Sequence, residues 1–252
     1  MRRLTALLVL GAALVAAAPA SAAPLHVLIT NDDGVRAEGI DALARAVLAE
    51  PDTRITIVAP ASNQSGTGGR TTSGPLDRFA ETTRSGLPAT AVRGTPADSV
   101  RVALEDVIPA DRPDLVLSGI NDGANLGAVR DNSGTVGAAR AGANRGLPAL
   151  ATSQGSGSPA RFEDGVAATI AWLRANRGSL VPGTVQNLNT PTCRFGAHAL
   201  GLLEVPATNA FDLDTLLFAA GQQPVCRAAG AAPRDDVRAY KQGYSALSPI
   251  RP

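Results

Sequence analysis

This chain of 252 residues is organised around the stretch Leu25-His26-Val27-Leu28-Ile29-Thr30-Asn31-Asp32-Asp33-Gly34. Four of its first five residues are apolar, which is the pattern of a central strand in a parallel sheet. Asp32 and Asp33 then lie where the chain leaves the strand, at the edge where open α/β sheets bind ligands. Adjacent carboxylates repel one another, and a divalent cation with oxygen ligands is the simplest partner for them. Taken alone, Asn-Asp-Asp-Gly is better explained as a turn with a helix cap, so the rest of the chain has to decide.

The first 23 residues have the pattern of a secretory signal peptide. Arg2 and Arg3 form a basic start, and residues 4–18 are apolar or small apart from one threonine. Ala20-Ser21-Ala22 supplies the small-residue cleavage pattern, so we expect cleavage at about Ala22 or Ala23. A membrane anchor is the alternative, but the run is short and rich in alanine. We therefore expect a periplasmic or secreted protein that has no membrane association after cleavage.

The composition argues against several classes of function. Removing the leader removes two of the 23 basic residues and none of the 22 acidic ones, which leaves 21 basic and 22 acidic residues. This balance is not that of a protein that binds a nucleic-acid polymer. His26 and His198 are the only histidines, and the spacing of Cys193 and Cys226 matches no zinc pattern. In an exported protein two cysteines more often form a disulfide than a metal site, but the sequence leaves their pairing open.

Strand and helix patterns alternate along most of the chain. Strands are predicted at 25–29, 54–59 (ended by Pro60), 89–93, 114–118, 148–152 and 184–188. Helices are predicted at 38–48, 95–107, 133–144 and 162–176. This order predicts an α/β fold whose parallel sheet is covered on both faces. Residues 184–188 form the last clear strand, so we divide the chain into a leader (1–23), a core (24–190) and a divergent C-terminal extension (191–252).

Two aspartate motifs need a separate interpretation. Thr95, Pro96 and Asp98 have the residue types of an N-cap, a first helical position and an N3 position, so we predict that Asp98 is a cap and not a catalyst. Asp212-Leu213-Asp214-Thr215 superficially resembles an aspartyl-phosphate nucleophile, but it follows no buried strand. The chain also has no phosphate-binding Gly-x-x-x-x-Gly-Lys-Ser/Thr loop and no Gly-x-Ser-x-Gly elbow, and no Gly-x-Gly-x-x-Gly follows the first strand.

Polar clusters follow three of the predicted strands. They are Asn31/Asp32/Asp33, Asn63/Ser65 and Ser118/Asn121/Asn125. Because the carboxyl ends of parallel strands share one edge, we expect the clusters to converge, and their carboxylate, amide and hydroxyl oxygens suit Mg²⁺, Mn²⁺ or Ca²⁺. Ser133-Gly134-Thr135 opens a predicted helix, where free N–H groups and the helix dipole favour a phosphate. A metal beside an anion pocket indicates metal-assisted phosphoryl hydrolysis.

Five motifs in this order carry a family resemblance. They are Asn31-Asp32-Asp33-Gly34, Asn63-Gln64-Ser65-Gly66, Gly94-Thr95-Pro96-Ala97-Asp98, Ser118-Gly119-Ile120-Asn121 with Gly123 and Asn125-Leu126-Gly127, and Ser133-Gly134-Thr135-Val136. Together they closely resemble the SurE survival-protein family of metal-dependent 5′/3′-nucleotidases. The resemblance covers roughly residues 25–189 and a fragment near the C-terminus.

The resemblance implies a Rossmann-like, three-layer α/β fold with a mostly parallel sheet, and a homodimer. It implies hydrolysis of nucleoside monophosphates by attack of a water activated by one divalent metal ion, Mg²⁺ or Mn²⁺, with Asp32 as the base. The implied metal ligands are Asp32, Asp33, Ser65 and Asn121. The implied phosphate-binding residues are Asn63, Asn125, Ser133, Gly134 and Thr135. The implied catalytic residues are Asp32, Asn63, Asn125 and Ser133.

The chain departs from the family pattern in three places. It has an export signal, Asn132 stands where the family commonly has an aromatic residue, and the segment between Asn189 and Asp235 does not resemble the family's extended hairpin. Two alternatives therefore stand beside the nucleotidase. One is a broad-specificity acid phosphatase or exopolyphosphatase, and the other is a non-catalytic protein that binds a metal or phosphate.

Overall fold

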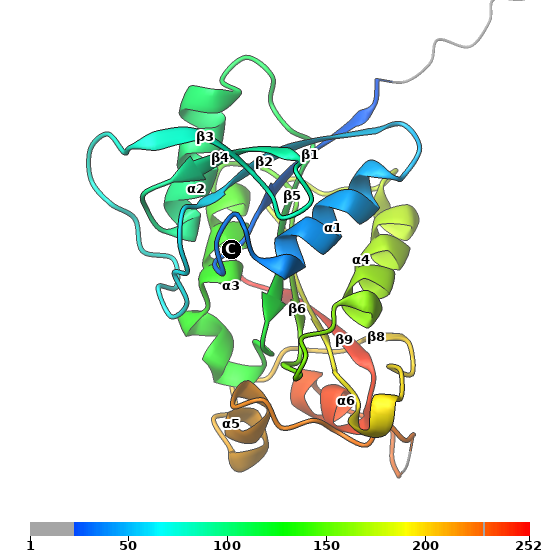
Figure 1. The fold of residues 1–252 in the computed structure, drawn as a ribbon. Coiled ribbons are helices and arrows are strands. Elements are labelled where there is room, and N and C mark those ends of the chain that lie inside the picture. The colour runs from blue at the N-terminus through cyan, green and yellow to red at the C-terminus, as the bar shows by residue number, and fades with distance from the viewer. Residues whose placement is uncertain (1–22, 229) are drawn as a thin grey trace, which may run out of the picture.

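The structure is a computed structural model that describes residues 23–228 and 230–252. This part of the chain forms one nine-stranded sheet in the order β3-β4-β2-β1-β5-β6-β7-β9-β8 (Figure 1). The central strands β4, β2, β1, β5, β6 and β7 are parallel, while β3 and β9 run antiparallel to their inner neighbours. The strands are β1 (Leu25–Thr30), β2 (Thr53–Pro60), β3 (Arg78–Thr82), β4 (Pro88–Val92), β5 (Leu115–Asp122), β6 (Ala149–Gln154), β7 (Val185–Thr190), β8 (Leu202–Glu204) and β9 (Ser245–Ile250).

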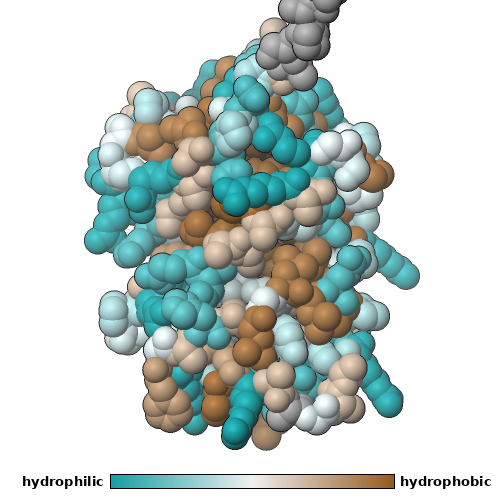
Figure 2. All heavy atoms as spheres, turned by 90° about the vertical axis from the view of Figure 1, so that its right-hand side faces the viewer, coloured by the Kyte–Doolittle hydropathy of each residue, from teal (hydrophilic) through white to brown (hydrophobic). Residues whose placement is uncertain are grey.

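Helices cover both faces of this sheet and make it the middle of three layers (Figure 1). On one face, α1 (Glu38–Leu48) and α4 (Glu163–Asn176) pack on a cluster that includes Val27 and Ile29 of β1. On the other face, α2 (Pro96–Val102), its π-helical continuation η1 (Ala103–Val107) and α3 (Gly134–Ala143) pack on a cluster that includes Leu28. The strand period of two thus sends alternate residues of β1 into two separate cores. Figure 2 shows the face on the side of α1 and α4, where apolar areas alternate with hydrophilic ones.

The predicted elements of the core are confirmed. Each of the six strands and four helices lies within a few residues of its expected place, and α1 has the predicted bounds. The predicted cap is also present. Thr95 Oγ1 accepts a hydrogen bond from the backbone N–H of Asp98, and the Asp98 carboxylate accepts one from the backbone N–H of Thr95.

Three expectations about strands are wrong. The second strand runs through Pro60 instead of ending before it, and β3 was not predicted. Residues 184–188 are not the last strand, because β9 pairs antiparallel with β7 and β8 pairs parallel with β9. These segments are short or contain a proline, and a strand gains most of its stability from neighbours that are distant in sequence. The C-terminal extension therefore completes one side of the main sheet.

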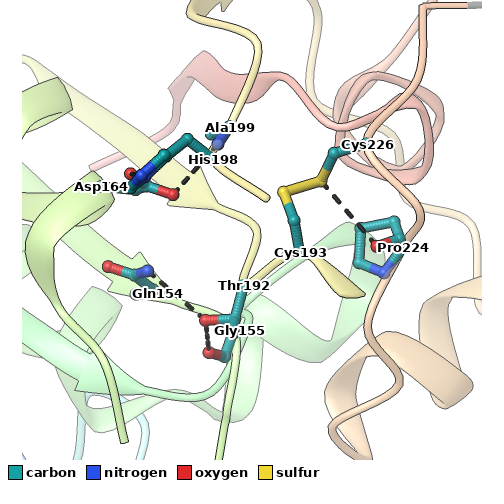
Figure 3. Close-up of a disulfide and its surroundings, with 9 residues drawn as sticks. All are labelled: Gln154, Gly155, Asp164, Thr192, Cys193, His198, Ala199, Pro224 and Cys226. Carbon is teal, nitrogen blue, oxygen red and sulfur yellow. Dashed lines mark hydrogen bonds and ion pairs between the residues drawn. A yellow bond between two sulfur atoms is a disulfide. The ribbon is translucent and has the colours of Figure 1, made fainter. Parts of the chain in front are cut away.

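The extension is tied to the core at the carboxyl end of β6 and the start of α4 (Figure 3). Cys193 and Cys226 form a disulfide with a Cα–Cα distance of 5.6 Å, which answers the question that the sequence left open. The Thr192 hydroxyl donates to the Gly155 carbonyl, and His198 Nδ1 lies 2.7 Å from a carboxylate oxygen of Asp164. Two helices, α5 (Leu213–Ala219) and α6 (Asp236–Gln242), complete the extension. Asp212 caps α5 by accepting the backbone N–H of Thr215 at 3.0 Å, which explains the aspartate motif there.

The predicted signal peptide lies, except for its last residue, outside the described residues. Among the residues that are described, no helix has the length and apolar character needed to cross a membrane.

Candidate active site

The turn after β1 is held by Asn31, which is fully buried. Its Nδ2 donates to the Gly34 carbonyl at 3.0 Å, and its Oδ1 accepts the Gly34 N–H at 3.3 Å. Gly34 has φ +107°, and a Cβ there would lie 3.2 Å from the carbonyl carbon of Ser62, so the position requires glycine. Because Asn31 makes the turn, the carboxylates of Asp32 and Asp33 are left for another role.

Asp32 is almost completely buried against the N-terminus of α3. The Thr135 hydroxyl donates to Asp32 Oδ1 at 2.6 Å. Burial raises the pKa of Asp32, and hydrogen bonds from the side chain and backbone of Thr135 and from the backbone of Gly134 offset part of that rise. A Cβ on Gly134 would lie only 2.7 Å from the Asp32 Cβ. The start of α3 is therefore shaped around this carboxylate.

Asp33 is half-buried beside Asp32. Its Oδ2 accepts the backbone N–H of Asp122 at 3.1 Å, and its Oδ1 lies 3.5 Å from Asn63 Nδ2. Burial, and then the neighbouring carboxylate of Asp32, raises the pKa of Asp33 to about 7. No arginine, lysine or histidine among the described residues forms an ion pair with either carboxylate. No cationic side chain therefore offsets the negative charge that this pair carries when both carboxylates are ionised.

The loop of residues 61–77 brings Asn63 to this pair, and Ser65 follows two residues later. The backbone N–H of Gln64 donates to the Asp32 carbonyl at 2.7 Å, and Asn63 Oδ1 accepts the Ser65 N–H at 2.9 Å. Farther along the loop, the Gly68 N–H donates to the Asn132 carbonyl at 3.1 Å, directly before the start of α3. The loop thus bridges the β1 turn and the α3 N-terminus.

Asn121 and Asn125 come from the end of β5 and the segment after it. Asn121 Nδ2 donates to the Gly123 carbonyl at 2.7 Å, which leaves Oδ1 as the side-chain atom that could bind a cation. Asn125 is held in a buried polar network. Its Nδ2 donates to Ser153 Oγ at 2.9 Å, its N–H donates to Asn189 Oδ1 at 2.7 Å, and its carbonyl accepts from Asn187 Nδ2 at 2.9 Å.

The structure places the predicted residues unequally. Direct hydrogen bonds link Thr135 to Asp32 and Asn63 to Asp33, and the two aspartates are adjacent in sequence. Ser133 acts as the N-cap of α3, with Oγ accepting the Val136 N–H at 3.2 Å. The Thr135 hydroxyl is already used by Asp32, and the Asn125 amide nitrogen by Ser153. The observed bonds of both side chains therefore orient neighbouring side chains of the site.

The donor set fits a hard divalent cation. Within residues 23–228 and 230–252 there is no cluster of three or more histidine, cysteine, aspartate or glutamate side chains that could hold a metal. A cation at this site would therefore rest on the carboxylates of Asp32 and Asp33 and on the neutral oxygens of Ser65 and Asn121. Such all-oxygen sets suit Mg²⁺ or Mn²⁺ and suit zinc poorly.

Sequence reasoning missed one contributor to the site, the backbone N–H of Asp122, which donates to Asp33 Oδ2. No side-chain pattern could reveal a backbone donor, because every residue type except proline supplies one.

This chain is similar to known proteins of one family. The family model described as "Survival protein SurE" matches residues 27–205. A 5′-nucleotidase SurE of Synechococcus sp. (strain CC9311) is 41% identical over 184 residues, 71% of this chain and 68% of that protein. One of Prochlorococcus marinus (strain MIT 9313) is 49% identical over 133 residues, 52% of this chain and 49% of that protein.

A solved structure supports the same assignment. The crystal structure of SurE from Aquifex aeolicus has a TM-score of 0.72 and 27% sequence identity, and the alignment covers 90% of this chain and 93% of that chain. The sequence matches to curated relatives span between about half and two thirds of the relatives' own length. Both the family and the α/β fold inferred from the motifs are confirmed, and the chain belongs to the SurE family.

Proposed function

We propose that this SurE-family enzyme hydrolyses phosphate monoesters of nucleotides, as a 5′/3′-nucleotidase. The observation that carries the proposal is the uncompensated pair Asp32 and Asp33 at the N-terminus of α3. A carboxylate pair that binds a cation beside a helix N-terminus suits a phosphate group, which needs positive charge and N–H donors. The names of the curated relatives, 5′-nucleotidase SurE, support the same activity.

Asp32, Asp33, Ser65 and Asn121 would hold one divalent cation, Mg²⁺ or Mn²⁺. When bound, such a cation lowers the pKa of a water molecule and offsets the charge that develops on the phosphoryl oxygens. The family resemblance gives the phosphate-binding residues as Asn63, Asn125, Ser133, Gly134 and Thr135, and the catalytic residues as Asp32, Asn63, Asn125 and Ser133. The Asn125 amide nitrogen and the Thr135 hydroxyl already donate to Ser153 and Asp32, so we propose that the side chains of these two residues act by positioning the site.

The hydrogen bonds around Asp32 define how it would act as a base. The Thr135 hydroxyl donates to Oδ1, and we propose that Oδ2 accepts the proton of the attacking water. Gly134 keeps the space beside Oδ2 open, because a Cβ there would lie 2.9 Å from that atom. Thr135 thus orients the carboxylate, and Gly134 gives it room.

The proposal extends to location and assembly. A protein that keeps the Cys193–Cys226 disulfide suits an oxidising compartment, which supports export by the predicted signal peptide to the periplasm or beyond the cell. We also propose a homodimer. Seven of the ten large apolar side chains that are exposed in the described residues lie between residues 195 and 225, and exposed apolar clusters commonly mark interfaces.

The test is phosphate release by the mature protein, from residue 24 onward, with EDTA and then with added Mn²⁺ or Mg²⁺. The substrates are 5′- and 3′-mononucleotides, p-nitrophenyl phosphate and tripolyphosphate. We expect release that EDTA abolishes, that metal restores and that is fastest with mononucleotides. Equal release from p-nitrophenyl phosphate or tripolyphosphate would favour the broad phosphatase. No release from any substrate by protein that binds the metal would favour the binding protein.

A further inference from the structure

A cavity of about 530 Å³ lies at the carboxyl ends of β2 and β4, beside the loop that carries Asn63 and Ser65. Its lining includes Gln64, Thr72, Phe79, Val92, Arg93 and Thr95. β4 lies two strand positions from β1, which is about 10 Å at the usual spacing of neighbouring strands. The cavity therefore opens on the same edge of the sheet as the carboxylate pair, a short distance along it.

Phe79 and Arg93 give this cavity a flat, cationic wall. The Arg93 guanidinium carbon lies 5.4 Å from the centroid of the Phe79 ring, and 40% of Phe79 is exposed. In the part of the chain that the structure describes, the Arg93 side chain forms no ion pair and no hydrogen bond, unlike most arginines of the core. An aromatic ring stacked with a guanidinium is a surface on which planar heterocycles stack.

Gln64 connects this wall to the proposed phosphate site. It lies between Asn63 and Ser65, and its backbone N–H donates to the Asp32 carbonyl at 2.7 Å. Gln64 also lines the cavity, where its side-chain amide offers the donor and acceptor pair that matches the edge of a base. One short loop segment therefore contributes to both the carboxylate site and the cavity.

We propose that this cavity binds the base of the nucleotide substrate, with Phe79, Arg93 and Gln64 determining the preference for nucleotides over simple phosphate esters. The cavity volume lies within the range of small-molecule sites. This inference rests on the proposed nucleotidase activity. It says where the nucleoside part of the substrate, which leaves when phosphate is released, would bind. The phosphate lies at the β1 edge, and the base stacks on the Phe79–Arg93 wall.

The test compares kcat/KM for 5′-AMP and for ribose 5-phosphate, which lacks the base, in the mature metal-loaded protein. The variants are Phe79→Leu, Arg93→Gln and Gln64→Ala. The matched control is Arg78→Gln, an exposed arginine on β3 whose ion pair is with Asp106 and which does not line the cavity. We expect kcat/KM for 5′-AMP to fall about fivefold or more in Phe79→Leu and Arg93→Gln, through KM, because loss of stacking weakens base binding. Values for ribose 5-phosphate should stay within twofold.

Equal losses on both substrates, or no loss on either, would overturn the inference. If the wild-type protein releases phosphate from neither substrate, the proposed function fails, and adenosine binding measured by calorimetry then tests the cavity separately. Adenosine binding that Phe79→Leu and Arg93→Gln abolish and that Arg78→Gln retains supports the cavity. Absence of adenosine binding to wild-type protein overturns it.

Discussion

The turn after β1 and the C-terminal extension are stabilised in different ways. At the turn, buried groups are in direct contact: Asn31 closes on Gly34, Asp32 accepts from Thr135, and Gly134 leaves no space for a methyl group. The extension instead depends on two small apolar clusters and on a few ties between segments that are distant in sequence. The Cys193–Cys226 disulfide is one of these ties. The Arg130 guanidinium donates to the Thr208 carbonyl and to Asn209 Oδ1, and the Asp236 carboxylate accepts the backbone N–H groups of Gly127 and Thr208.

The two regions meet at η2 (Gly127–Asn132), the 3-10 helix that leads into Ser133. Arg130 and the backbone of Gly127 connect this helix to the extension, and the Asn132 carbonyl accepts the N–H of Gly68 from the loop of residues 61–77. The difference teaches that the proposed active site is built from buried groups in direct contact, whereas the extension supports one flank of it. Substitutions in the first region should affect turnover most, and those in the second should affect stability most.

The largest effect is expected at Asp32. Asp32→Asn keeps an acceptor for Thr135 but removes the negative charge and the proton acceptor, so phosphate release should fall by roughly 10²–10⁴-fold. The melting temperature should change little, because the amide fills the same space. Glu38→Gln, an exposed acid-to-amide change in the first turn of α1, is the matched control and should keep its activity. Retention of more than a tenth of wild-type turnover by Asp32→Asn would remove this residue from the mechanism.

Loss of the disulfide should be the largest change in stability. The bond joins residues 33 positions apart, and constraint of a loop of that length in the unfolded chain corresponds to about 3–4 kcal/mol. The Cys193→Ser/Cys226→Ser protein should therefore have a lower free energy of unfolding in urea, and activity should change less than tenfold. Reductant should destabilise the wild type and leave the double variant unchanged. Equal stability of the two proteins would show that the extension is held by its other contacts.

A methyl group at Gly134 should lower both the stability and the activity of the protein. In Gly134→Ala, the added Cβ meets Asp32 and Pro96 within 3.0 Å, so the free energy of unfolding should fall by about 1–3 kcal/mol. Activity should fall as well, because Asp32 must move. Gly69→Ala is the matched control, since nothing lies within 4 Å of a Cβ there. The close packing described for Asp32 would be disproved by a Gly134→Ala protein as stable and active as the control.

The smallest effect is a difference in how two buried aspartates respond to pH. Burial by itself would raise the pKa of Asp98, but hydrogen bonds from the backbone of Thr72 and Thr95 bring the pKa below its ordinary value of 3.8. The Arg101 guanidinium also lies 3.8 Å from Asp98 Oδ1. Its stabilising contribution is therefore present above pH 3.8 and is lost as the pH falls through the lower folded-state pKa. In the extension, burial raises the pKa of Asp236, and Thr208, Gly127 and Arg130 offset only part of the rise.

The sign for Asp236 is therefore reversed. The native state binds more protons than the unfolded state between pH 3.8 and the raised pKa, so this contribution to stability falls as the pH rises through that window. Urea unfolding between pH 3 and pH 7 checks both residues. The stability deficit of Asp98→Asn should shrink toward pH 3, whereas that of Asp236→Asn should shrink as the pH rises. Parallel pH profiles for the two variants would contradict these assignments.

Local patterns alone located most of the core. The apolar run of β1, the amphipathic spacing of α1 and the Thr95–Asp98 cap depend on neighbours a few residues away, and each was predictable. The polar clusters after the strands were also readable, because parallel strands send their carboxyl ends to one edge. The family followed from the same motifs.

Only the tertiary structure decided which atoms these motifs leave available. The hydrogen bond from Thr135 to Asp32 joins residues 103 positions apart, and it orients the Asp32 carboxylate by occupying Oδ1. The pairing of β9 with β7, the disulfide and the Phe79–Arg93 wall likewise depend on segments that meet only after folding. The residue types of the site were legible in sequence because they are local, whereas their roles depend on long-range contacts that no local pattern records.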